Sequence, residues 1–498
     1  MLSPESTAPF SWLIGHTGDG SASILDRLRR WPHLEPALND RQSEIDQWKE
    51  AVRRRRSAGR PRRVLFVHGQ LPGETGSGVY LQQIAAEAIR RGLDMYVLSA
   101  GYRTLSAADI AGIPDERIFT CRFTMADRTP VPGAVRTPIS GMSVVMPYPV
   151  LAYRDRTEAE LLDLLAVFGR HMAELVARLQ PDAIHVDHLW FLNGLARLIA
   201  PWIPLVAACH GTAYKLIVDT PRLRELVVPC VSSAEHVCAI SPETVAQCTE
   251  IFEVPEGRIT IEGYGFEPDL FNFKQVDRDS VLKTNFGFTL KPGSRLVVAV
   301  GKFVDWKGFK ELALAIGHLR QRGHDITGVI VGEGDPQSRA DLEAFIERQG
   351  VKNHLLLPGK VARTALPDIY RAADLYVLPS HVEPYGMVLM EALACGAPAV
   401  FGRTGGPPSF VPQSLCDEGL AVMVDPIRLS NDATPLPGER EAYAQRLADG
   451  MATVMEKGIA NEDRLRIAEA MLPLSWGRLV DNLIRIYERL VAEAVPTV

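Results

Sequence analysis

The sequence lacks the features that would place it in a membrane, a secretory pathway or a nucleic-acid complex. Its 498 residues contain no apolar run near the roughly 20 residues that a membrane-spanning helix needs. The first residues, Met1–Glu5, have no basic start followed by an apolar core, so we expect no secretion signal. A formal net charge of -6 gives no reason to expect a nucleic-acid partner. We therefore expect a cytoplasmic location.

Cysteines are few and do not form a pattern. The chain has seven, an odd number, and no Cys-x2-Cys pair. This spacing argues against a disulfide framework and against a zinc site, so reduced, mostly buried thiols are expected. They lie at Cys121, Cys209, Cys230, Cys238, Cys248, Cys395 and Cys416.

Two series of short apolar segments, each alternating with helical patterns, indicate an α/β protein. The first series runs from Val64–His68 to His236–Ile240, and the second from Arg295–Val300 to Pro398–Phe401. Such alternation predicts parallel sheets covered on both faces. A polar, turn-rich passage over residues 265–293 separates the two series.

We therefore predict four parts. An extension over residues 1–60 has expected helices near Ser21–Arg30 and Arg41–Arg55 and few core candidates. Two α/β domains follow over residues 61–275 and 276–470, and a last segment, 471–498, contains a helix near Trp476–Ala494. That helix carries apolar residues on one face, namely Leu479, Leu483, Ile486, Tyr487 and Leu490. The basic run Arg53–Arg56 could contact an acidic lipid surface or an anionic acceptor, or it could be a solvated helix end.

The most informative segment is residues 380–396, SHVEPYGMVLMEALACG, where two carboxylates lie eight residues apart. A strand-like run precedes it, so Glu383 is expected at the carboxyl edge of a sheet, while Gly386 begins a helix that contains Glu391. Acids in so apolar a helix are costly unless they are hydrogen bonded or bind a ligand. The free amides of Tyr385, Gly386 and Met387 could hold an anionic phosphate. A ligand site is therefore predicted.

This segment resembles the Glu-x7-Glu motif of the retaining family 4 glycosyltransferases, which have the GT-B fold of two facing Rossmann-like domains. The resemblance implies a cleft between the domains and a last helix that crosses back to the first domain. It also implies that Glu383 orients the transferred sugar and Glu391 holds the ribose, with the diphosphate at the amides of Tyr385, Gly386 and Met387. Asp277 and Asp279 resemble the metal-binding acid pair of another glycosyltransferase fold, but they lie in the turn-rich passage between the two series. We interpret them as a solvated turn, and we predict no metal requirement and no cofactor.

Further positions match the family in part. Lys302 and Lys307 stand where relatives have Arg and Lys for the donor phosphates, so the first departs and the second agrees. His210 opens a His-Gly-Thr sequence whose His contacts the sugar in the family. The resemblance also assigns donor binding to a glycine loop, with Gly76 and Gly78, and to a backbone position near Val361. Ser409 stands where relatives usually have Glu.

Other interpretations of these residues are weaker. His185 and His188 could suggest a metal cluster, but strand alternation points them apart and favours a structural role. The glycine loop could suggest a nicotinamide site, yet the second strand ends at Leu98–Gly101 without the acid that would hold a ribose.

We expect a retaining glycosyltransferase that uses a UDP- or GDP-linked sugar. The acceptor is expected to be a soluble small molecule, such as a secondary-metabolite or a thiol or hydroxyl precursor, bound near Met142, Met146 and Tyr148. Alternatives are a transferase acting on a lipid-linked or polysaccharide acceptor, an inactive sugar-nucleotide-binding regulator, and a relative with epimerase or phosphorylase chemistry.

Overall fold

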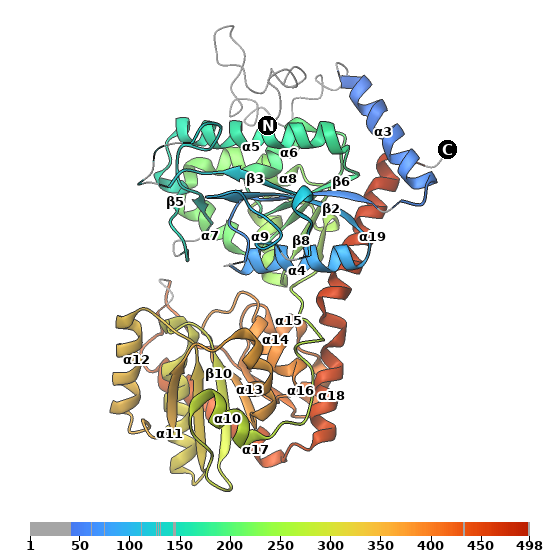
Figure 1. The fold of residues 1–498 in the computed structure, drawn as a ribbon. Helices are drawn as coiled ribbons and strands as arrows, with labels where there is room; N and C mark the ends of the chain where they lie inside the picture. The colour runs from blue at the N-terminus through green and yellow to red at the C-terminus, as the bar shows by residue number, and fades with distance from the viewer. Residues whose placement is uncertain are drawn as a thin grey trace. The chain divides into compact units, whose positions relative to one another are not determined.

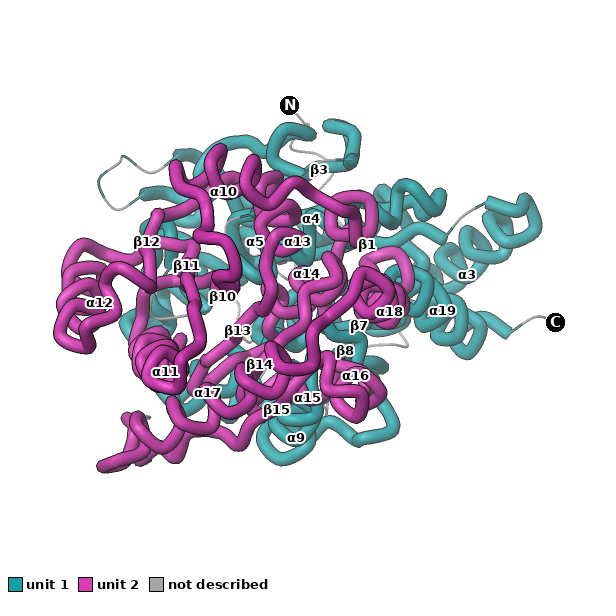
Figure 2. Tube along the Cα trace, turned by 90° about the horizontal axis from the view of Figure 1, so that it is seen from below, with its two compact units in different colours: residues 1–263, 479–498 teal, residues 264–478 magenta. Residues whose placement is uncertain are grey.

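The computed structural model describes most of the chain from residue 41 onward. The described residues are 41–60, 62–73, 75–110, 112–125, 127, 129, 131–142, 146–431 and 434–496. The helix predicted near Ser21–Arg30 lies outside them. The chain divides into two compact units (Figure 2). Unit 1 comprises residues 1–263 and 479–498, and unit 2 comprises residues 264–478.

Unit 1 is built on a seven-stranded parallel sheet with the order β3-β2-β1-β6-β7-β8-β9. The strand order reverses between β1 and β6, which are neighbours in the sheet. Ligands of open α/β sheets bind at such a switch point, outside the carboxyl ends of the strands. The strands are β1 (Arg63–His68), β2 (Asp94–Gly101), β3 (Ile118–Arg122), β6 (Ala183–Asp187), β7 (Leu205–Ala208), β8 (His236–Ala239) and β9 (Ile259–Ile261).

Helices cover both faces of this sheet: α5 and α6 lie on one face and α4 on the other (Figure 1). A short parallel pair, β4 (Ser140–Gly141) and β5 (Leu151–Ala152), precedes α5. The helices are α4 (Gly76–Arg90), α5 (Glu158–Leu179), α6 (Phe191–Ile199), α7 (Thr212–Asp219), α8 (Arg224–Ser232) and α9 (Pro242–Glu250).

Unit 2 repeats the design with a six-stranded parallel sheet of order β12-β11-β10-β13-β14-β15. Its switch point lies between β10 and β13. The strands are β10 (Arg295–Val300), β11 (Ile326–Val331), β12 (Leu355–Gly359), β13 (Leu375–Leu378), β14 (Ala399–Gly402) and β15 (Ala421–Val424). The helices are α10 (Arg278–Phe286), α11 (Phe309–Gln321), α12 (Pro336–Arg348), α13 (Leu366–Ala372), α14 (Met387–Ala394), α15 (Pro407–Phe410), α16 (Gln413–Asp417), α17 (Glu439–Lys457) and α18 (Asn461–Met471).

The predicted fold class, two Rossmann-like α/β domains, is confirmed by these two parallel sheets. The last helix, α19 (Trp476–Ala494), belongs to unit 1 from Leu479 onward. All five apolar residues predicted for one of its faces are buried. One of them, Tyr487, has a hydroxyl 2.6 Å from Nδ1 of His185 in the unit 1 sheet.

The helix before the first strand, α3 (Gln42–Ser57), packs more deeply than its charged sequence predicts. Trp48 is 1% exposed and belongs to the core of unit 1, as does Val52. The indole N–H of Trp48 donates to the carbonyl of Pro181 at 2.7 Å. Because the indole buries both its apolar area and its polar atom, this segment is part of the unit 1 fold.

The basic run of α3 is partly engaged in the same packing. Arg55 donates to the buried carboxylate of Asp182 at 2.7 Å, and Arg56 donates to the carbonyl of Val495. Arg53 and Arg54 remain exposed. Within the described part of the chain, none of the helices is long and apolar enough to span a bilayer.

We predict that Trp48→Ala lowers the free energy of unfolding by about 3–5 kcal/mol, because it removes a buried aromatic side chain and leaves a cavity. Urea denaturation of the full chain measures this change. Gln47→Ala, at an exposed position of the same helix, is the matched control and should change stability by less than about 0.5 kcal/mol. Equal, small effects of the two substitutions would show that α3 does not contribute to the core.

Candidate active site

In unit 2 a buried acid and a lysine meet at the switch point of the sheet. Glu383 follows β13 and is 5% exposed, and Lys307 follows the neighbouring strand β10. The Lys307 ammonium donates to Oε2 of Glu383 at 2.6 Å, and the Ser380 hydroxyl donates to the same oxygen at 2.9 Å. The lysine therefore compensates the charge of a carboxylate that would otherwise be costly to bury.

The helix after Glu383 begins without a side-chain cap from any residue that the structure describes. Gly386 is the N-cap of α14 with φ of 94°, a conformation that favours glycine, and no side chain caps the helix. Met387 is the first residue of the helix. An uncapped helix start with its dipole is a binding site for an anion such as a phosphate.

Glu391 lies in α14 and is paired with an arginine that the sequence analysis missed. Arg363 donates to Glu391 at 3.1 Å and to both oxygens of Glu267 at 2.6 and 2.7 Å. Burial raises the pKa of Glu391 to about 7, although the charge of Arg363 opposes that shift. A carboxyl group with a pKa near 7 is partly ionised at neutral pH, and its ionised form can accept hydrogen bonds from a diol.

The loop that carries Glu383 rests on a second glycine turn, Gly405-Gly406. A Cβ added to Gly405 would lie 1.7 Å from the carbonyl oxygen of Glu383, and one added to Gly406 would lie 2.4 Å from Cα of Tyr385. The amide of Gly406 donates to the same Glu383 carbonyl at 3.2 Å. The turn can therefore support the loop that carries Glu383 only if residues 405 and 406 are both glycine.

Other residues predicted for the donor site differ in their surroundings. Lys302 is exposed and makes no ion pair with any described residue. Val361 is half-buried. The Tyr385 hydroxyl donates to the carbonyl of Tyr264 at 3.1 Å, and burial raises its pKa to about 12, so this side chain is structural. Ser409, where relatives usually have Glu, donates to the carbonyl of Gly406.

In unit 1 a buried aspartate accepts hydrogen bonds from two histidines. Asp187 ends β6 and is the register partner of His68, which ends β1. His68 Nδ1 lies 2.5 Å from one carboxylate oxygen, and His210 Nε2 contacts the other. Burial would raise the pKa of Asp187, but these imidazoles hold it well below its ordinary value. Asp187 therefore fixes the orientation of His210, which follows β7.

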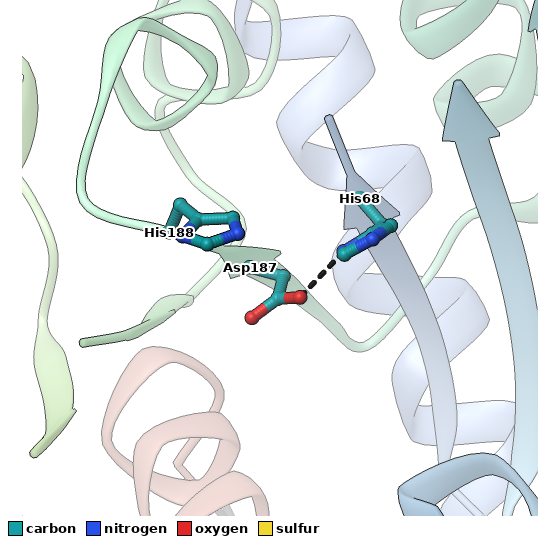
Figure 3. A group of neighbouring side chains, drawn as sticks. All are labelled: His68, Asp187 and His188. Carbon is teal, nitrogen blue, oxygen red and sulfur yellow. Dashed lines mark hydrogen bonds and ion pairs between the residues drawn. The ribbon is translucent and has the colours of Figure 1, made fainter. Parts of the chain in front are cut away.

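His188 is the unexpected member of this cluster. It has φ of 77°, which returns its side chain toward Asp187 and away from the strand pattern. Candidate ligand atoms of His68, Asp187 and His188 lie within 4.8 Å of one another, which is close enough to consider a metal ion (Figure 3). Both oxygens of Asp187 already accept hydrogen bonds from imidazoles, so we interpret the group as a hydrogen-bonded cluster. Burial lowers the pKa of His188 to about 3, which keeps it neutral.

The glycine loop predicted for unit 1 leads into α4. Gly76 is the first residue of the helix, and Thr75 caps it by accepting from the amide of Gly78 at 3.1 Å. A Cβ on Gly78 would lie 2.5 Å from the amide nitrogen of Gly73, so the loop is too tight for a side chain there.

The three residues predicted for the acceptor do not share one environment. Met142 is buried and lines a small cavity with Asp187 and His188. Tyr148 is half-buried, and its hydroxyl accepts from the amide of Leu71 at 3.4 Å. Met146 is half-buried. Their assignment to the acceptor remains a prediction.

Two parallel sheets of nearly the same strand order, each covered by helices, are the architecture of the GT-B class of double Rossmann-like proteins. Models of known families identify the same units. Residues 75–265 match "Glycosyl transferase 4-like domain" and residues 283–421 match "Glycosyl transferases group 1". The chain belongs to the group 1, family 4 glycosyltransferases.

Similar sequences include D-inositol 3-phosphate glycosyltransferases. That of Xylanimonas cellulosilytica is 30% identical over 240 residues, which are 45% of this chain and 56% of the relative. That of Mycolicibacterium smegmatis is 25% identical over 455 residues, 87% of this chain and 92% of the relative. The chain thus spans about half the length of several curated relatives and most of others.

Solved structures share the fold at low identity. Anabaena HepE in complex with UDP is 17% identical with a TM-score of 0.61, covering 86% of this chain and 100% of that chain. Sucrose-phosphate synthase from Thermosynechococcus elongatus is 18% identical with a TM-score of 0.56, covering 87% and 100%. These likenesses establish the fold.

We predict that Gly405→Ala disrupts the site loop, because its Cβ would overlap the Glu383 carbonyl. Gly350→Ala is the matched control, since Gly350 has a similar positive φ of 69° but nothing within 4 Å of the added Cβ. Gly350→Ala should cost only the backbone strain of about 1–2 kcal/mol, whereas Gly405→Ala should cost more and also weaken nucleotide binding at least tenfold. Urea denaturation and calorimetric titration with UDP measure both effects. Identical behaviour of the two variants would contradict the role of the turn.

Proposed function

We propose that the protein is a retaining glycosyltransferase that moves a sugar from a nucleoside diphosphate sugar, UDP- or GDP-linked, to a small-molecule acceptor. The observation that carries this proposal is the group at the unit 2 switch point. The helix α14 starts at Gly386 without a side-chain cap and contains the buried Glu391. Beside it, the Lys307 ammonium lies 2.6 Å from Oε2 of Glu383.

Each part of a donor has a matching group in unit 2. The amides at the start of α14 and the ammonium of Lys307 suit the diphosphate, and Lys302 adds a second, exposed cation. Glu391 suits the ribose diol, because an ionised carboxylate only accepts hydrogen bonds. Glu383 is assigned to a hydroxyl of the transferred sugar, and Val361 to backbone contact with the base.

The chemistry needs no protein nucleophile. The bond between the sugar C1 and the diphosphate oxygen breaks, and the acceptor oxygen forms its bond to C1 on the face that the diphosphate leaves. The acceptor proton passes to a phosphate oxygen. Cationic and amide donors lower the barrier by stabilising charge that develops on the leaving diphosphate. We assign to His210, oriented by Asp187, the sugar contact that the family resemblance implies.

The curated relatives favour a small phosphorylated polyol as a first acceptor to test. Several are named D-inositol 3-phosphate glycosyltransferases, and one of them matches over 87% of this chain. A lipid-linked or polysaccharide acceptor is the competing substrate class. Arg53 and Arg54 are the exposed members of the basic run that it would use.

A thermal-shift panel tests the proposal. UDP, GDP, ADP and dTDP and their sugars are added to the full chain, and the true donor should raise the melting temperature most, because it binds the native state. Slow release of nucleotide from that donor in water shows a working transferase site. Binding without any turnover indicates an inactive regulator, and the absence of any shift contradicts the proposed function.

We predict that Glu383→Gln lowers transfer at least a hundredfold while the affinity for UDP changes by less than about threefold. Glu383 is assigned to the sugar, so the nucleotide keeps its contacts with Lys307 and α14. The amide keeps the shape of the side chain and removes its charge. Initial rates with donor and calorimetry with UDP measure the two quantities. A large loss of UDP affinity would show that Glu383 acts through the nucleotide site.

We predict that the affinity for UDP-glucose rises with pH between about 6 and 8. The pKa of Glu391 is raised to about 7 in the unliganded protein, and the ribose hydroxyls require the ionised form. Below this pKa, affinity should therefore fall, approaching tenfold per pH unit. UDP-glucose is a suitable ligand because its diphosphate is a diester and does not titrate in this range.

The matched control for this titration is Glu391→Gln, whose affinity should be lower and independent of pH over the same range. Glu383→Gln should keep the wild-type pH dependence. A flat profile for the wild type would contradict the assignment of Glu391 to the ribose.

A further inference from the structure

A cavity of about 470 Å³ lies in unit 1 at the carboxyl ends of β1, β2 and β3. Its walls come from the segments that follow these three strands, so it lies at the edge of the sheet where α/β proteins bind ligands. Cavities of this volume hold small organic molecules. Its walls include Leu71, Tyr102, Arg103, Arg122, Phe123 and Thr124.

Among the described charged residues that line the cavity, one arginine has no acidic partner. Arg103 binds Asp109 through two hydrogen bonds, so that pair is neutral as a unit. Arg122, at the end of β3, makes no ion pair with any residue that the structure describes. The Nε of Arg122 is buried and has no hydrogen-bond partner. The lining therefore carries one net positive charge.

A second polar group in the same wall is also unsatisfied. Thr124 is 4% exposed, and its hydroxyl oxygen is buried without a hydrogen-bond partner. A buried polar atom without a partner costs about 1–3 kcal/mol, and more for a charged group, so such atoms require an explanation. Two unsatisfied donors, two residues apart and lining one cavity, indicate a ligand that is rich in acceptor oxygens.

We propose that this cavity binds the anionic group of the acceptor, a phosphate or carboxylate, with Arg122 as the anchoring cation and Thr124 as a hydrogen-bond donor. The proposal rests on the proposed function, because it names the substrate class of that enzyme. A planar guanidinium binds either group through paired N–H donors. A neutral sugar would leave the charge of Arg122 uncompensated.

The loop after β1 connects this cavity with the histidine cluster. Leu71 and Pro72 border the cavity, while Gly69 and Gln70, immediately before them, border the smaller cavity that contains Asp187. The loop is held at two consecutive residues, since Ser99 donates to the carbonyl of Gln70 and the amide of Leu71 donates to Tyr148. An acceptor anchored at Arg122 therefore shares one ordered loop with the cluster that orients His210.

Calorimetry and acceptor-stimulated release of UDP from a UDP-sugar test this proposal on the full chain. The probes are inorganic phosphate, hexose monophosphates, hexuronates and the corresponding neutral hexoses. At least one anionic sugar should bind and stimulate release, whereas its neutral parent should not. The relative effects of phosphates and carboxylates identify which anion the site takes.

The decisive variant is Arg122→Gln, which should weaken binding of the anionic sugar at least about tenfold without changing the affinity for the UDP-sugar. Arg122→Lys should retain part of the binding, because it keeps the charge and loses the fork. The double variant Arg103→Gln/Asp109→Asn is the matched control, because it removes from the same cavity a pair that is neutral as a unit and leaves the net charge of the lining unchanged; its effect should stay within threefold.

Equal binding of anionic and neutral sugars, or equal binding by the wild type and Arg122→Gln, would overturn the proposal. If a UDP-sugar binds and no anionic probe does, the anion site fails alone. If hexose phosphates bind through Arg122 and no nucleotide sugar binds, the proposed function fails while the anion site stands. Should Arg122→Gln not fold, the wild-type comparison of each anionic sugar with its neutral parent decides the question.

Discussion

Burial of carboxylates at the carboxyl edges of both sheets is the constraint on which the rest of this structure depends. An ionised acid removed from water is stable only if cations or hydrogen-bond donors replace its hydration. Unit 1 surrounds Asp187 with two imidazoles, and unit 2 pairs Glu383 with Lys307 and Glu391 with Arg363. The paired residues lie between 23 and 119 positions apart in the sequence, so each pairing depends on the fold.

The environments of the two unit 2 acids differ, and that difference supports the separate roles proposed for them. Glu383 accepts hydrogen bonds from an ammonium and a hydroxyl, which hold its carboxylate in one orientation. Glu391 is buried with a raised pKa, and its arginine is shared with Glu267. These environments fit the proposed roles, in which Glu383 accepts a hydrogen bond from a hydroxyl of the transferred sugar and Glu391 accepts hydrogen bonds from the ribose.

The sequence predicted the parallel sheets, the position of Glu383 after a strand and the helix that contains Glu391, because these follow from local patterns over a few residues. It did not reveal Arg363 or the cluster around Asp187, because those contacts depend on which strands become neighbours. His68 and Asp187 are 119 residues apart and meet only through the register of β1 and β6. The positive φ of His188 departs from strand geometry, so the side chain does not follow the alternation of β6 and lies near Asp187. Trp48 lies in a highly charged helix, α3, and the indole is buried because this helix packs against the core of unit 1, which the local sequence of the helix does not reveal.

The stereochemistry of transfer tests the central claim most directly. The wild-type protein is mixed with an α-linked UDP-sugar without acceptor, and the sugar released by water is followed by ¹H NMR before its anomers interconvert. A retaining site delivers water to the face that the diphosphate leaves, so the α anomer should appear first. First appearance of the β anomer would contradict the account of how the unit 2 acids and the donor diphosphate act.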